Sequence, residues 1–155
     1  MRLALFEPDI PQNAGAMMRL GACLGVGVDL IEPCGFVIGS AAFRRAGMDY
    51  LDHVDWRRHS SWAHFHANAC RPPARLVLLT TQAETGYTDF RFRETDILLL
   101  GRESAGVPDH VHELAGARIS VPMAPHMRSL NVATAAAMVL GEALRQTGGL
   151  NNWRF

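Results

Sequence analysis

Lysine is absent from this chain of 155 residues, and its 15 basic residues other than histidine are all arginine. Without lysine the chain can form neither a Walker-type phosphate grip nor a lysine Schiff base. The segment Gly101–Gly106 has the glycine spacing that begins a P-loop, but Val107 and Pro108 follow it in place of Lys and Ser or Thr. A P-loop NTPase is therefore excluded.

Two other glycine-based signatures are also missing. No G-x-G-x-x-G occurs, and Gly25-Val26-Gly27 precedes an expected strand where a dinucleotide fingerprint would open a helix. Ser104 stands in G-x-x-S-x-G, which is not the spacing of a hydrolase nucleophile elbow. A nicotinamide-dependent oxidoreductase is thus a weak alternative, and a serine hydrolase has no support.

Cysteine is scarce, and long apolar runs are lacking. The chain has three cysteines, which are Cys23, Cys34 and Cys70. Their odd number and the absence of a C-x-x-C pair favour reduced thiols and predict no metal site. The opening run Leu3–Phe6 stops at Glu7-Pro8, and the apolar stretch 132–144 contains Glu142 and is too short to span a bilayer. We therefore expect a cytoplasmic protein with no membrane partner.

What the chain does contain is a regular alternation of short apolar runs and helical patterns. With 48% hydrophobic and 19% charged residues, it is expected to fold as one compact domain, 1–155. The alternation predicts an α/β fold with a mostly parallel sheet flanked by helices. Strands are expected at 2–6, 28–31, 54–58, 76–80, 96–100 and 118–121. Helices are expected at 11–24, 41–46, from a cap at Ser60 or Ser61 to Ala69, 108–114 and 132–146.

Charge is balanced overall but unevenly distributed. The formal net charge is zero, yet residues 44–75 hold six arginines against three aspartates. Such a basic stretch suggests contacts with RNA phosphates, while an ordinary solvated surface is an equally good explanation. The RNA-binding candidates in it are Arg44, Arg45, Arg57, Arg58 and His59.

Polar residues with chemical potential gather in three segments, which are Asn13–Arg19, Gly101–Pro108 and Pro122–Asn131. Each has a structural explanation as well as a functional one. Ser129 and Asn131 precede the long helix and could simply cap it. Arg19 could form a surface salt bridge, and Glu103 a loop hydrogen bond.

Taken together in this order, the three segments resemble the SpoU-type branch of the SPOUT superfamily of RNA ribose 2′-O-methyltransferases. Its motifs are matched by N-x-G-x-x-x-R at 13–19, by 98–108, and by 119–123 with 129–132. The absence of an added RNA-binding domain, together with the segments at 6–13, 31–36 and 44–50, resembles the minimal tRNA (cytidine/uridine-34)-2′-O-methyltransferases. The resemblance covers nearly the whole chain.

The resemblance implies a C-terminal trefoil knot, a homodimer, a tRNA substrate and S-adenosyl-L-methionine (SAM) as methyl donor. It places the cofactor on Leu79, Gly101, Val121, Ser129 and Leu130. It places catalysis on Arg19, Glu103, Asn13 and Asn131, with Arg128 as a phosphate contact. In the family the corresponding arginine lies at the acceptor hydroxyl and has been proposed as its base. Since arginine keeps its proton in nearly all proteins, we expect Arg19 to orient the ribose, held by Glu103, and a base role would require a strongly perturbed site.

One departure from the family pattern concerns the long helix, where Ala133 replaces a serine found in many SpoU-type enzymes. Arg102 and His126-Met127 also differ from the usual pattern, which affects the substrate more than the cofactor. Two alternatives therefore stay open: methylation at another tRNA or rRNA site, and a knotted RNA-binding protein without catalysis.

Overall fold

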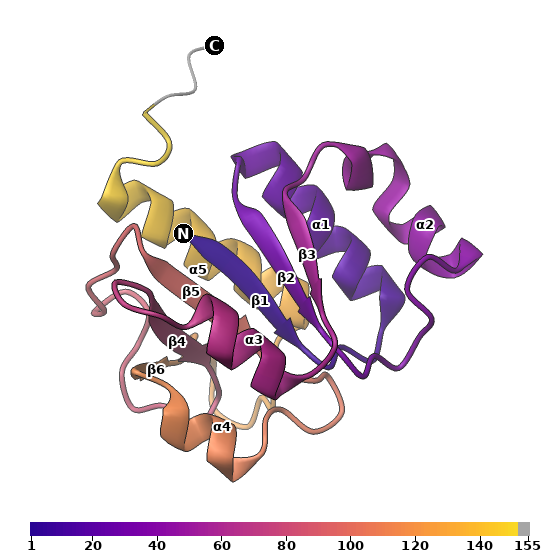
Figure 1. Ribbon diagram of the computed structural model, residues 1–155. Helices are drawn as coiled ribbons and strands as arrows, with labels where there is room; N and C mark the ends of the chain where they lie inside the picture. The colour runs from indigo at the N-terminus through magenta and orange to yellow at the C-terminus, as the bar shows by residue number, and fades with distance from the viewer. Residues whose placement is uncertain (152–155) are drawn as a thin grey trace.

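A computed structural model describes residues 1–151, and it contains one six-stranded sheet (Figure 1). The strands lie in the order β3-β2-β1-β5-β4-β6, and every pairing between them is parallel. Their bounds are β1 Arg2–Phe6, β2 Gly27–Ile31, β3 Trp56–His59, β4 Arg75–Leu79, β5 Asp96–Leu100 and β6 Ala117–Ile119. The predicted α/β class with a mostly parallel sheet is confirmed.

The helices connect these strands: α1 Pro11–Leu24, α2 Ala41–Gly47, α3 Trp62–Ala69, α4 Asp109–Leu114 and α5 Val132–Thr147. Their ends follow local chemistry. Ser61 caps α3 by accepting from the N–H of His64, and Gly25 ends α1 with a left-handed φ of 62°. All five expected helices are present, and the sequence missed only the short 3₁₀ helix Met48–Asp52.

Two predicted strands differ from the structure by two residues at one end, and the other strands agree with it to within one residue. The strand expected at 54–58 runs from Trp56 to His59, because Val54 is buried in the core before the strand begins. The last strand was expected at 118–121 but ends at Ile119, after which Ser120 bonds to the segment around Thr85.

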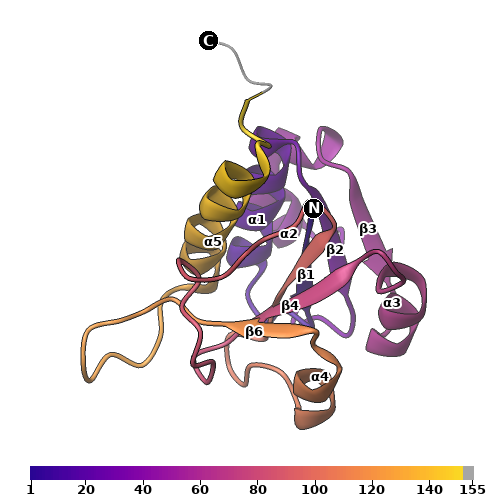
Figure 2. The ribbon, with the colours of Figure 1, turned by 90° about the vertical axis from the view of Figure 1, so that its left-hand side faces the viewer.

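The molecule has three layers, with helices on both faces of the sheet (Figure 2). Side chains of one strand face, including Leu3, Leu5 and Leu98, pack with α1, α2 and α5. The opposite face, including Ala4, Phe6 and Leu99, packs with α3 and α4. Burial of both faces explains why the strands read as continuous apolar runs.

Helix α1 packs unusually closely against α2, and Gly15 permits this. A Cβ atom at Gly15 would lie 2.4 Å from the backbone carbonyl carbon of Ala46. Gly15 thus serves contact between two helices, and α1 is held with its first turn at the carboxyl edge of the sheet.

Within the described residues, no helix combines the length and the apolar character needed to cross a bilayer. The predicted trefoil knot concerns how the chain threads through itself after β6, and it stays a prediction.

Candidate active site

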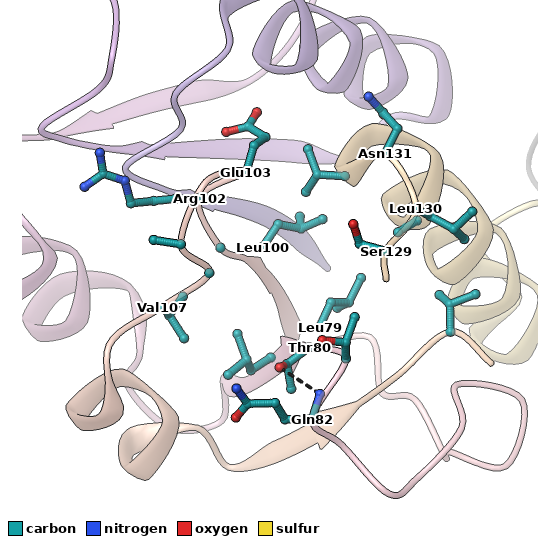
Figure 3. Close-up of a pocket in the computed structure, with 18 of the residues that line it drawn as sticks. Leu79, Thr80, Gln82, Leu100, Arg102, Glu103, Val107, Ser129, Leu130 and Asn131 are labelled. Atoms are coloured by element: carbon teal, nitrogen blue, oxygen red, sulfur yellow. Dashed lines mark hydrogen bonds between the residues drawn. The ribbon is translucent and has the colours of Figure 1, made fainter. Parts of the chain in front are cut away.

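The carboxyl ends of the parallel strands share one edge of the sheet, so the loops that leave β1, β4, β5 and β6 meet there. Between them lies a pocket of about 570 Å³ (Figure 3). Apolar side chains of the strand ends, such as Leu79, Leu100 and Ile119, line it together with polar residues of the loops. The volume is within the usual range for small-molecule sites.

The three segments singled out in the sequence converge at this pocket, and side-chain hydrogen bonds join them. Asn13, from α1, donates its amide to Glu103 Oε1 at 2.9 Å. Asn131, from the head of α5, donates its amide to Asn13 Oδ1 at 2.9 Å. Glu103, Asn13 and Asn131 all line the pocket, and we call this series of bonds the relay.

The relay has a fixed direction. An ionised carboxylate only accepts hydrogen bonds, so Asn13 must turn its NH₂ toward Glu103 and its oxygen toward Asn131. Asn131 then turns its own oxygen to the N–H groups of Ala133 and Thr134, at 2.9 and 3.2 Å, and caps α5. The capping role considered for Asn131 is confirmed and is combined with a place in the pocket, whereas Ser129 lines the pocket without capping the helix.

The loop between β5 and α4 is closed on itself. Arg102 and Gly106 exchange two backbone hydrogen bonds of 2.9 Å. A Cβ atom on Gly101 would lie 2.7 Å from the carbonyl carbon of Gly106, which itself has a φ of 67°. Both glycines are therefore required by the backbone of this loop.

All five residues predicted for the cofactor line this one pocket: Leu79, Gly101, Val121, Ser129 and Leu130. Three further lining residues were not predicted from the sequence: Thr80, Gln82 and His112. In Figure 3 the first two lie at the end of β4, where the backbone N–H of Gln82 donates to Thr80 Oγ1 at 3.2 Å. Their position directly after a buried strand was the available signal.

Arg19 is placed differently from the expectation. It lies six residues after Asn13, about 9 Å farther along α1 and on another side of the helix. Its guanidinium lies 4.8 Å from the ring centroid of Tyr50, the residue is exposed, and it does not line the pocket. Glu103 accepts from Asn13 and from the N–H of Asp9, and among residues 1–151 no hydrogen bond or ion pair joins it to Arg19, so the predicted contact is not formed within this chain.

The basic candidates divide into exposed and buried residues. Arg44, Arg45 and Arg128 are exposed, and Arg44 donates to the carbonyl of Gly39 at 2.8 Å. Among the strand residues, Arg58 forms an ion pair with Glu32, and Arg57 lies 3.6 Å from Asp55.

His59 does not belong to a basic surface. It is 6% exposed, packs edge-on against Phe65, and its Nε2 lies 2.8 Å from Oδ1 of the buried Asp29. The prediction that His59 contacts RNA is wrong, because α3 and the sheet cover it.

Cys34 and Cys70 are free thiols that are partly buried. Burial raises the pKa of Cys34 to about 12 and that of Cys70 to about 11, so both stay protonated near neutral pH.

Among residues 1–151, no group of three or more His, Cys, Asp or Glu side chains is arranged to hold a metal ion.

Comparison with known proteins agrees with this geometry. A sequence model of the SpoU rRNA Methylase family matches residues 1–141. A protein of Beijerinckia indica named tRNA (cytidine(34)-2'-O)-methyltransferase is 62% identical over 148 residues, which cover 96% of this chain and 92% of that protein. An Ancylobacter novellus protein of the same name is 58% identical, with 96% and 94% coverage.

Solved structures show the same similarity. A structure from work on the 2-OH methylation of C/U34 on tRNA superposes with a TM-score of 0.87, at 42% identity and 94% coverage of both chains. The SpoU methyltransferase AviRb from Streptomyces viridochromogenes, in complex with the cofactor AdoMet, superposes with a TM-score of 0.84 at 27% identity. That comparison covers 94% of this chain and 60% of AviRb.

Proposed function

This chain belongs to the SpoU rRNA Methylase family, and on that premise we propose that it is a tRNA (cytidine/uridine-34)-2′-O-methyltransferase. It transfers a methyl group from SAM to the ribose 2′-hydroxyl of the wobble nucleotide, a C or a modified U. The observation that carries the proposal is the relay, which unites the three family segments at one pocket. The substrate is supported by the names of relatives that match over nearly their whole length.

The pocket has the properties that SAM requires. Its apolar walls suit an adenine ring, and backbone N–H and C=O groups at strand ends can read the edge of the base. Gly101 lets the backbone of the closed loop fold back on itself beside the pocket, and both Gly101 and Gly106 line the pocket. Leu79, Gly101, Val121, Ser129 and Leu130 would hold the cofactor. When bound, SAM supplies a methyl group on a positively charged sulfur, which leaves as a neutral thioether.

The demanding part of the reaction is the acceptor. A ribose hydroxyl is a weak nucleophile, so it must be held in line with the methyl group, about 3 Å away, and lose its proton as it attacks. In this site Glu103 orients Asn13, and Asn131 and Ser129 contribute polar side chains to the lining. Arg19 lies outside the pocket of its own chain; as an orienting cation it would act on the acceptor, with Arg128 on a neighbouring phosphate, and it is not the base because arginine does not release its proton.

A direct test uses tritium-labelled SAM and tRNA transcripts that differ only at nucleotide 34. We expect label to enter a transcript with cytidine 34, and to be lost when 2′-deoxycytidine replaces it. Undiminished labelling of the deoxy transcript would show that the 2′-hydroxyl of nucleotide 34 is not the methyl acceptor. Label that enters only rRNA would favour another SpoU-type substrate. Absence of SAM binding at millimolar concentration would favour a non-catalytic RNA-binding protein.

We also propose a homodimer in the cytoplasm, in which one domain of residues 1–155 forms each half. The outer face of α5 supports an interface: Met138 is 40% exposed, and a Cβ atom at Gly141 would meet nothing within 4 Å. A small-residue face allows a second helix to approach closely. Sedimentation equilibrium at micromolar concentration should give twice the mass of one chain, and a monomer would refute the dimer.

A further inference from the structure

A second set of polar contacts attaches the 101–106 loop to the segment that follows β1. Asp9 lies at its centre. Its Oδ1 accepts from Arg102 Nη2 at 2.9 Å and from Nε at 3.3 Å, and its Oδ2 accepts from the N–H of Ser104 at 3.1 Å and from the Ser104 hydroxyl. We call Asp9, Arg102 and Ser104 the clasp.

The clasp is connected to the relay through one backbone group. The N–H of Asp9 donates to Glu103 Oε2 at 2.8 Å, while Glu103 Oε1 accepts from Asn13. Asp9 therefore grips the loop twice, with its carboxylate on Arg102 and Ser104 and with its amide on the residue between them. Arg102 adds a contact of 3.2 Å to Glu7 Oε2. Glu103 is thus held between Asp9 and Asn13.

The charges of the clasp are matched internally. The Ser104 hydrogen bond, followed by the Arg102 guanidinium, holds the pKa of Asp9 below its usual value, so its carboxylate is ionised at neutral pH. Arg102 faces two carboxylates, and in Figure 3 its side chain points away from the centre of the pocket. Arg102 also lines the pocket, but its charge is paired with the carboxylates of Glu7 and Asp9.

We propose that Asp9 is a positioning residue for methyl transfer: it fixes Glu103 and thereby the orientation of Asn13. Asp9 does not line the pocket, so it acts only through others. Arg102 and Ser104 are the means by which its carboxylate holds the loop. This inference rests on the proposed function for its kinetic consequence, while its structural half concerns the relay alone.

The kinetic test is a double-mutant cycle with Asp9→Asn and Arg102→Gln. Each single variant should lower kcat about tenfold, while the Kd for SAM by titration calorimetry changes less than about threefold. Because both substitutions break one contact, the double variant should be no slower than the slower single variant. An additive loss, an unchanged kcat in Asp9→Asn, or a Kd that rises in step with the loss of kcat would each overturn the proposal.

A readout without catalysis tests the structural half. The side-chain amide of Asn13, assigned with an Asn13→Ala variant, should exchange its protons with water faster in Asp9→Asn. Unchanged exchange would refute the link between Asp9 and the relay, even if the protein methylated no tRNA. Asp55→Asn is the matched control, since Asp55 also has a pKa lowered by an arginine, Arg2, but lies at the opposite edge of the sheet. It should change neither kcat nor the exchange.

Discussion

The side-chain amide of Asn131 donates to the side-chain oxygen of Asn13 across 2.9 Å, although 118 positions separate the two residues in the chain. The oxygen of the same Asn131 caps α5. A helix cap and an active-site contact are therefore one side chain, and its two ends cannot be exchanged while Glu103 fixes Asn13. Substitutions that separate these two duties give the sharpest test of the site.

Asn131→Asp should preserve the helix and damage the reaction. Aspartate is as good an N-cap as asparagine, so the free energy of unfolding in urea should stay within about 1 kcal/mol of the original. The donor to Asn13 is lost, however, and a carboxylate then faces the Asn13 oxygen. Methyl transfer under single-turnover conditions should fall at least about tenfold.

Asn131→Ala is the companion variant, since it removes the cap and the relay together. It should lose about 1 kcal/mol of stability as well as activity. If Asn131→Asp transferred methyl groups at the full rate, the donor to Asn13 would have no part in the site.

Gly101→Ala should impair cofactor binding through the backbone. Its Cβ atom would lie 2.7 and 2.8 Å from backbone carbons of Gly106, and backbone cannot turn aside as a flexible side chain can. The closed loop must open, so we expect the Kd for SAM by calorimetry to rise at least about tenfold.

Gly106→Ala separates this clash from simple backbone strain. Its φ of 67° is unfavourable for alanine by about 1–2 kcal/mol, but its Cβ atom would meet open space. This variant should be less stable yet bind SAM more tightly than Gly101→Ala. Equal SAM affinities for the two variants would contradict the assigned role of the loop.

The sequence predicted the fold well because its signals are local. The strand at Arg2–Phe6 and the helix at Pro11–Leu24, which Gly25 ends, are defined by neighbouring residues, and both were predicted correctly. His59 was misjudged because its neighbours Arg57 and Arg58 are basic and exposed, whereas its partner Asp29 lies 30 positions away. The clasp was invisible for the same reason, since Asp9 and Arg102 meet only after β1 and β5 have paired.

The RNA surface can be separated from the core by two kinds of variant. Arg44→Ala and Arg45→Ala remove exposed charges, so each should weaken tRNA binding and reduce its salt dependence, by about one unit of slope per lost phosphate contact. Their unfolding curves should be unchanged. Filter binding at several salt concentrations measures the slope, and a slope equal to that of the original protein would remove these arginines from the RNA surface.

His59→Ala should do the reverse. It takes a hydrogen-bond partner from the buried Asp29, at a cost of about 1–3 kcal/mol in stability, and it should leave the tRNA affinity of the folded protein unchanged. Loss of tRNA affinity without loss of stability would show that this histidine is accessible to RNA after all.

Arg19→Ala tests the one catalytic candidate that lies outside its own pocket. SAM binding should stay within a few-fold, since Arg19 touches none of the pocket walls, while methyl transfer should fall by about a hundredfold or more. Full activity would remove Arg19 from the catalytic centre.

Mixing Arg19→Ala with Asn131→Ala identifies the pocket that Arg19 serves. In a randomly reassorted population of dimers, half of the dimers contain one chain of each variant. Recovery of about a quarter of the original rate assigns Arg19 to the partner's pocket, and no recovery assigns it to its own.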